Sequence, residues 1–292
     1  DSVRIRIIDY HTNIVLIEKN GEVVYAPESV TFEKSENALV TEKDAMTIAE
    51  IVDFADTVDL SDIGDTIRRQ IQYNSAISAA GLAHDYGANV GRILLKTYGN
   101  DVKIRAMAAP AAGSDARMSG CELPVIIVSG SGNQGICATM PVVVFAEENH
   151  NTDEELVRAL MLSHLTAIYI KQSLGRLSAL CGCVVAATGS SCGITWLMGG
   201  TYEQVSFAVQ NMIANLTGMI CDGAKPSCAL KVTTGVSTAV LSAIMAMETR
   251  CVTSVEGIID EDVDQSIRNL TKIGSKGMNE TDKVVLEIMT GK

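Results

Sequence analysis

The first thirty residues show the alternation of apolar and polar positions that is typical of β-strands. Residues 4–8 and 13–17 follow this pattern, and Asn20-Gly21 then separates two β-rich runs. This dipeptide favours a type I′ turn, so residues 22–25 are predicted to form the return strand of a hairpin. Because a ribbon of two or three strands is barely stable alone, we expect it to pair with strands outside this chain, as in a fragment of a longer protein.

From Thr41 onward the pattern becomes helical. Thr41 has the side chain of an N-cap, Asp44 follows in the first turn, and apolar residues then recur at helical spacing. Helices are predicted to continue over residues 61–98, with interruptions near Gly81 and Gly87.

Residues 124–128 carry a second β signal and predict a short buried strand. The glycine-rich segment 129–135 follows this strand and leads into a further helix. Residues 151–155 have the polar and acidic side chains that favour a helix start. The remaining pattern predicts helices with glycine-rich joints over 153–250 and an amphipathic helical tail from Glu261.

These elements together predict an α+β fold in which a short N-terminal β-ribbon is followed by a large, mostly α-helical domain. The ribbon, residues 1–40, would belong to an incomplete α+β region, and residues 41–292 would form the helical domain. Hydrophobic residues make up 47% of the chain but aromatic residues only 4%, so aliphatic side chains on closely packed helices must form the interior. The net charge of -12, without a basic stripe, argues against a nucleic-acid partner.

The segment between Arg176 and Glu203 has no charged residue and is long enough to span a bilayer. Glycines and serines interrupt it, and neither a Lys/Arg asymmetry nor an aromatic belt flanks it, which favours a buried core helix over a membrane span. The N-terminus does not resemble a signal peptide, so we expect a cytoplasmic protein. Its eight cysteines are then metal ligands or buried free thiols rather than a disulfide framework.

Cysteines cluster in one apolar, glycine-rich region of the sequence. Cys221 and Cys228 bound a short, turn-rich loop between two helical runs, so both thiols can converge on one point, and Lys225 between them would favour thiolates. Thiolates suit an iron–sulfur cluster or zinc, but the CxxC spacing of structural zinc sites is missing. The competing interpretation is ordinary buried cysteines. The candidate metal ligands are Cys181, Cys183, Cys221 and Cys228, whereas core positions are expected for Cys121, Cys137 and Cys251.

The glycine-rich segment before a helix predicts an anion site, because the amides at a helix start are unpaired and glycines permit close approach. The segment lacks the Lys-Ser/Thr of a P-loop and the context of a dinucleotide site, so the carboxylate of a small substrate fits better. A tight turn that needs glycine for positive φ is the alternative. The candidate substrate-binding residues are Ser129, Ser131, Asn133, Gln134 and Gly135.

Three stretches resemble the serine dehydratase-like alpha-subunit family, and most closely its L-cysteine desulfidase branch: residues 11–21, residues 129–135, and residues 177–183 followed by Cys221 and Cys228. The resemblance implies a [4Fe-4S] cluster with an open iron site. It also implies β-elimination from a small amino acid, such as L-cysteine or L-serine, that gives pyruvate and ammonia without pyridoxal phosphate.

In iron–sulfur serine dehydratases three cysteines ligate the cluster, and the first precedes another cysteine by nine residues, as Cys183 precedes Cys192 here (192 − 183 = 9). The other two resemble Cys221 and Cys228, although the loop between them is shorter here, and Cys181 stays open beside Cys183 as the first ligand. Asn133 resembles the asparagine that helps to hold substrate. The Gly-Cys-Thr-Glu-Pro motif of the desulfidase branch, whose cysteine is the proposed base, is absent, so the resemblance implies a missing N-terminal segment of the same protein.

No catalytic residue is assigned from the sequence. The histidines are weak acid–base candidates, and Ser190, Ser191 and Lys225 could line the site. The alternatives to a lyase are a non-catalytic domain that binds a small ligand through the glycine-rich segment, an inactive fragment, or a membrane protein. The expected partners are a small amino-acid substrate and a second copy of the chain in a homodimer. The four histidines are His11, His84, His150 and His164.

Overall fold

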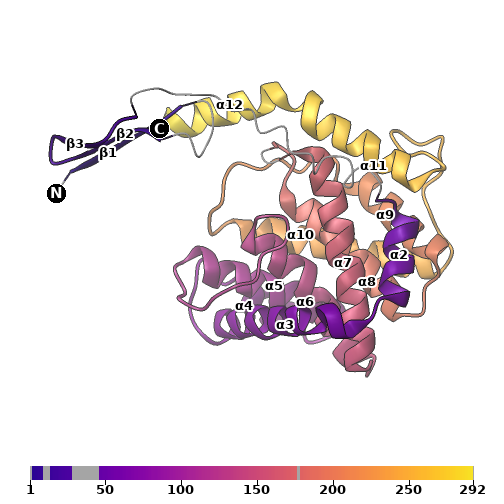
Figure 1. The fold of residues 1–292 in the computed structure, drawn as a ribbon. Coiled ribbons are helices and arrows are strands. Elements are labelled where there is room, and N and C mark those ends of the chain that lie inside the picture. Colours follow the sequence, from indigo (N-terminus) through magenta and orange to yellow (C-terminus); the bar gives the residue numbers. More distant parts are fainter. Residues whose placement is uncertain (1, 9–13, 28–45, 176–177, 292) are drawn as a thin grey trace. The chain divides into compact units, whose positions relative to one another are not determined.

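The computed structural model describes residues 2–8, 14–27, 46–175 and 178–291 (Figure 1). The chain divides into two compact units, Asp1–Ala45 and Met46–Lys292. The first contains a small antiparallel sheet and the second is built from helices. The predicted α+β fold, with a short N-terminal ribbon followed by a helical domain, is therefore confirmed.

The sheet of the first unit has the strand order β1-β2-β3, and both strand pairs are antiparallel. Asn20 and Gly21 connect β2 to β3 with φ angles of 53° and 87°, the left-handed conformation that a type I′ turn requires at both positions. The hairpin predicted from this dipeptide is present. The strands are β1 (Val3–Ile7), β2 (Ile14–Lys19) and β3 (Glu22–Tyr25).

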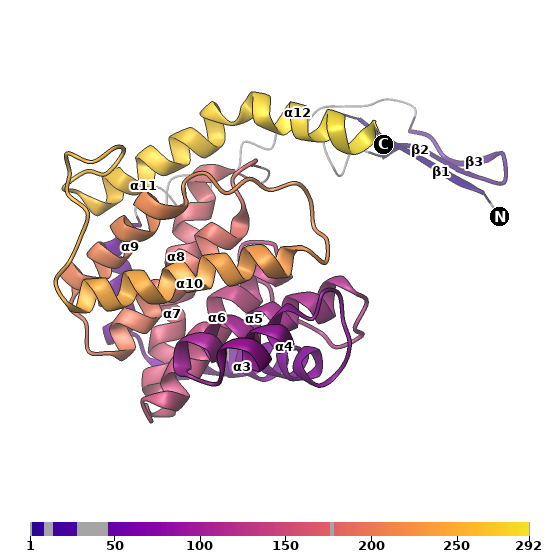
Figure 2. The ribbon, with the colours of Figure 1, turned by 180° about the vertical axis from the view of Figure 1, so that it is seen from behind.

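The second unit is a bundle of helices joined by turns and by longer loops (Figures 1 and 2). Its described helices are α2 (Ile48–Thr57), α3 (Leu60–Ala83), α4 (Val90–Tyr98), α5 (Val102–Met118), α6 (Gly132–Glu148), α7 (Asp153–Leu174), α8 (Gly182–Leu197), α9 (Tyr202–Leu216), α10 (Cys228–Met247), α11 (Val263–Lys272), the π-helical turn η1 (Ile273–Gly277) and α12 (Asn279–Thr290).

Helix α8 forms the centre of this bundle and contacts α6, α7, α9 and α10. Helix α7 lies on the near side in Figure 1 and α10 on the near side in Figure 2. Small residues make this arrangement possible: a side chain at Gly189 would overlap the Ser163 carbonyl of α7. Nearly every residue of α8 is buried, so the uncharged segment forms a core helix. Among the described residues, α10 alone is long and apolar enough to cross a membrane, and half of that window is buried.

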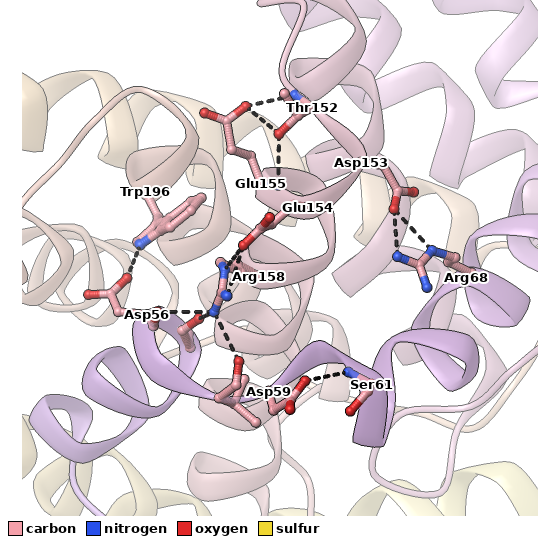
Figure 3. A network of polar contacts seen from close by, with 12 residues as sticks. Asp56, Asp59, Ser61, Arg68, Thr152, Asp153, Glu154, Glu155, Arg158 and Trp196 are labelled. Atoms are coloured by element: carbon pink, nitrogen blue, oxygen red, sulfur yellow. Dashed lines mark hydrogen bonds and ion pairs between the residues drawn. The ribbon is translucent and has the colours of Figure 1, made fainter.

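Arg158 of α7 holds the C-terminal end of α2 (Figure 3). Its Nη1 donates to the carbonyl oxygens of Ala55, Asp56 and Val58 at 2.9, 3.0 and 3.3 Å. The Trp196 indole of α8 donates to the Asp56 carboxylate at 2.8 Å. Cationic donors at a helix C-terminus satisfy its free carbonyl groups. These contacts therefore fix the end of α2 to α7 and α8.

Local helix signals were confirmed in part. Thr152 and Glu155 form a reciprocal capping box at the start of α7, as residues 151–155 predicted. The predicted N-cap Thr41 and its neighbour Asp44 lie outside the described residues, and the helix begins instead at Ile48 after the N-cap Thr47. The predicted break near Gly87 lies between α3 and α4.

The breaks predicted near Gly81 and Gly87 are one interruption, between Ala83 and Val90, and Gly81 itself lies inside α3. A Cβ atom there would overlap the Ala112 carbonyl of α5, so Gly81 permits the close packing of two helices. The strand predicted at residues 124–128 is wrong, since this segment is an irregular loop. The Asn74 side chain of α3 accepts from the Ile126 amide at 3.0 Å and donates to the Ile126 carbonyl at 3.2 Å. A side-chain amide thus takes the place of a neighbouring strand.

Candidate metal centre and the adjoining loop

Two short segments bring distant cysteines together. Residues 179–181 and 219–221 run antiparallel, with the Cys181 amide donating to Met219 at 2.9 Å and the Cys221 amide donating to Ala179 at 2.6 Å. Leu180 and Ile220 form the bridge between them, so the side chains of the next residue in each segment point to the same face. The Cys181 and Cys221 thiols lie close enough to each other that each affects the pKa of the other.

Cys181 also contacts the third candidate ligand. It is the N-cap residue of α8, and its thiol lies close to that of Cys183 in the first turn. The neighbouring Cys183 thiol, together with burial, raises the pKa of Cys181 to about 12, although the neighbouring Cys221 thiol acts in the opposite direction. The neighbouring Cys181 thiol is the main cause that raises the pKa of Cys221, and burial is the second. The charge of Lys231 opposes this increase.

Cys228 lies at the other end of the loop that begins with Cys221. Its thiol donates to the Gly223 carbonyl at 3.7 Å and accepts from the Lys225 amide at 3.4 Å. Cys181 therefore lies close to Cys183 and to Cys221, whereas the described contacts of Cys228 stay within its own turn. Over the described ranges, no group of three or more Cys, His, Asp or Glu side chains is arranged to hold a metal ion.

The remaining cysteines lie outside this contact group. The Cys137 thiol is fully buried and donates to the Cys183 carbonyl at 3.9 Å. Cys192 is buried in the middle of α8, where burial raises its pKa to about 12. Cys121 and Cys251 are partly buried.

The glycine-rich segment forms a tight turn at the start of α6. Ser129 and Gly130 have φ angles of 50° and 82°, and Val128 and Ser131 exchange backbone hydrogen bonds across the turn. Ser131 is the N-cap, with its hydroxyl accepting from the Gln134 amide at 3.4 Å. The tight turn, one of the two interpretations that the sequence left open, is thus present and leads into the predicted helix, whereas anion binding at this helix start stays a prediction.

Gln134 connects this segment to the cysteines. A Cβ atom at Gly182, the residue between Cys181 and Cys183, would lie 2.6 Å from Gln134 Nε2. Gln134 is only 7% exposed, and its Oε1 has no hydrogen-bond partner in the described part of the chain. The N-terminal turns of α6 and α8 therefore meet at this side chain.

Comparison with known proteins gives the family. Residues 21–287 match the family described as the serine dehydratase alpha chain. The chain belongs to the serine dehydratase alpha chain family. This agrees with the resemblance found in residues 129–135 and in the cysteine segments.

The chain is 62% identical over 287 residues to a UPF0597 protein of Bacteroides fragilis, an overlap of 97% of this chain and 66% of the relative. It is 63% identical over 290 residues to a UPF0597 protein of Bacteroides thetaiotaomicron, with overlaps of 97% and 66%. It is 47% identical over 287 residues to a UPF0597 protein of Desulfitobacterium hafniense, with overlaps of 98% and 66%. The chain thus spans about two thirds of the length of these relatives, whose names state no activity.

A buried polar network that the sequence analysis missed supports the loop. Thr139 Oγ1 donates to the Gly135 carbonyl at 2.7 Å, accepts from Gln70 Nε2 at 3.0 Å, and lies 3.3 Å from His164 Nε2. Burial lowers the pKa of His164 to about 4, so this ring is neutral at neutral pH. The i, i+4 spacing of the polar residues Gln70 and Asn74 on α3 could have indicated this network.

Two lysines lie beside the loop that follows Cys221, and the sequence analysis named only one of them, Lys225. Lys225 is ion-paired with Asp222 and donates to its carbonyl at 2.9 Å. Lys231, which the sequence analysis missed, donates to the Ile220 carbonyl at 2.7 Å and pairs with the same carboxylate. Hydrogen bonds from Lys225 and then Lys231 lower the pKa of Asp222 to about 2. These contacts fix the loop that follows Cys221.

Several weaker candidates have structural contacts instead. Ser190 and Ser191 are buried, and their hydroxyls donate to the carbonyls of Ala187 and Ala239 at 3.0 and 2.9 Å. His84 and His150 are exposed at helix ends, and His11 lies outside the described residues.

Proposed function

We propose that the full-length protein is an iron–sulfur lyase that eliminates the β-substituent of a small amino acid such as L-cysteine or L-serine, giving pyruvate and ammonia. The observation that carries this proposal is the position of the Cys181 thiol close to those of Cys183 and Cys221, next to Gln134 of the glycine-rich loop. A soft-ligand centre and a carboxylate-binding loop would then adjoin, as elimination from an amino acid requires.

The donor chemistry of this region fits a [4Fe-4S] cluster. Thiolates are the ligands that iron–sulfur clusters use, and thiols from two hydrogen-bonded segments already meet. The family is associated with such clusters, which supports the assignment. Cys221 and Cys228 would be ligands, with Cys228 exchanging its contact to the Gly223 carbonyl for iron. Between Cys181 and Cys183, the contact with Cys221 favours Cys181 as the third ligand.

A bound cluster with three protein ligands would supply an open iron that acts as a Lewis acid toward the β-thiol or β-hydroxyl group. The chain itself would bind and orient the substrate. Its carboxylate would lie at the start of α6, where the Gly132 and Asn133 amides have no partner among the described residues. The buried Oε1 of Gln134 would accept a hydrogen bond from the substrate ammonium group. Loss of the α-proton and the β-substituent gives an enamine, which water hydrolyses to pyruvate and ammonia.

The full-length protein is proposed to act in the cytoplasm with a small amino acid, without nucleic acid or membrane, and as a possible homodimer. The N-terminal segment of the same protein would complete the site. The second candidate function is a non-catalytic domain that binds a small amino acid. The ordered loop at residues 129–135 favours this function independently of the thiols.

Turnover on anaerobically purified full-length protein tests the proposal. We expect pyruvate and ammonia from L-cysteine or L-serine, a loss of at least about 10²-fold in Cys221→Ser, and near wild-type turnover in the control Cys251→Ser. Thermal stabilisation by amino acids that persists in Cys221→Ser, without pyruvate from the iron-reconstituted wild type, would support the binding domain instead.

A further inference from the structure

Arg117 lies at the start of α6 without an acidic partner. It belongs to the last turn of α5, and its Nη1 donates to Asn133 Oδ1 at 3.3 Å and to Met118 Sδ at 3.0 Å. A Cβ atom at Gly132 would overlap its Nε, so the guanidinium packs directly on the first residue of α6. Among the described residues no carboxylate lies within ion-pair distance of Arg117, unlike Arg105 on the same helix, which pairs with Glu148.

The surroundings of Arg117 favour an anion. The N-terminal amides of α6 and the helix dipole both present partial positive charge at Gly132 and Asn133. A guanidinium has five donors in a planar fork, and the described hydrogen bonds use only Nη1. The free Nε and Nη2 donors match the two oxygens of a carboxylate.

A second, independent observation comes from the same end of α6. Gln134, in the same helical turn, is 7% exposed, and its Oε1 has no partner in the described part of the chain. A buried acceptor without a partner is destabilising, and a bound donor would offset this cost. A carboxylate cannot bind this oxygen, but an ammonium group can. The two features together fit a molecule that carries both groups.

We propose that Arg117 binds the α-carboxylate of an α-amino acid, together with the first amides of α6. This inference rests on the proposed function and deepens it, because it makes Arg117 the residue that selects an amino acid over the corresponding amine. Gly132 belongs to the same binding site, since any side chain there would displace the Arg117 guanidinium.

Equilibrium binding to the full-length protein, purified without oxygen, tests this inference. The probes are L-alanine, which has both groups but no β-leaving group, and ethylamine, which lacks the carboxylate. Calorimetry on Arg117→Met should show L-alanine affinity weakened by about tenfold or more, with ethylamine affinity unchanged and partial recovery in Arg117→Lys. Arg69→Met, an exposed arginine of α3, is the matched control and should bind as the wild type does.

Gly132→Ala gives a second test that keeps the charge of the protein. It should reproduce the selective loss of L-alanine binding while the melting temperature confirms a folded protein. Equal L-alanine affinity in Arg117→Met and wild type, or an equal loss for ethylamine, would overturn the inference and leave the proposed function standing. A wild type that binds neither L-alanine nor L-serine would overturn both.

Discussion

The side-chain amide of Gln134 packs on the backbone of Gly182, where a Cβ atom would lie 2.6 Å from Gln134 Nε2. Gln134 belongs to the first turn of α6, and Gly182 lies between two of the candidate cysteine ligands. This one contact places the glycine-rich loop beside the thiols. A substrate held at the loop would therefore have its reacting end near the candidate metal ligands Cys181 and Cys183.

This contact predicts a specific cost for Gly182→Ala. The new methyl group would force the Gln134 amide away, so the free energy of unfolding should fall by about 1–3 kcal/mol in urea titrations. Gly218→Ala is the control, because no atom lies within 4 Å of a Cβ atom there. Equal stability of the two variants would show that Gln134 and Gly182 are not in close contact.

Asn74 is predicted to be necessary for the loop before α6. Asn74→Ala would leave the Ile126 amide and carbonyl without their partners, and the free energy of unfolding should fall by about 2–4 kcal/mol. Asn100→Ala, at an exposed position, should change it by less than about 0.5 kcal/mol. Chemical denaturation measures both. A small effect of Asn74→Ala would mean that water satisfies the Ile126 backbone.

His164 is predicted to make stability depend on pH. Burial lowers its pKa from 6.5 to about 4, so the unfolded chain binds the proton more readily than the folded one. The stability contributed by the neutral ring is fully present above pH 6.5 and is lost as the pH falls toward 4. The loss should approach about 3 kcal/mol. Urea titrations between pH 7.5 and pH 4.5 should show a steeper decline in wild type than in His164→Gln, and parallel curves would contradict this prediction.

The thiol contacts predict which cysteine begins the ligand set. Because the thiol of Cys181 contacts that of Cys221, Cys181→Ser should lower the iron content of anaerobically purified protein more than Cys183→Ser does. Iron per chain, measured by elemental analysis, gives the answer. The reverse order would assign Cys183 as the ligand instead.

Local signals explain which parts of the fold were predictable. The Asn20-Gly21 turn and the Thr152–Glu155 capping box depend on neighbouring residues, and both were found. The segment at 124–128 looked like a strand, but its backbone is paired by Asn74, which is distant in sequence. A glycine within a helical pattern suggests a break, but Gly81 is needed for close packing. Its neighbour, the Ala112 carbonyl, belongs to another helix, so the local sequence does not reveal this reason.

The candidate site was predictable in its residue types and not in its arrangement. The cysteines and the glycine-rich loop are visible in the sequence because their chemistry is unusual for a helical core. The contact of Gln134 with Gly182 and the approach of Arg117 to Gly132 depend on helix packing, which no local pattern encodes. Lys231 was missed because only the fold brings it to the loop after Cys221.

Iron and acid-labile sulfide in the full-length protein, purified without oxygen, test the central claim most directly. Cys181 and Cys221 should hold a common cluster, so the wild type should contain about four iron and four sulfide ions per chain. Cys221→Ser should lose most of both, while Cys251→Ser retains them. Wild-type protein that stays colourless and free of iron after anaerobic reconstitution would contradict the account.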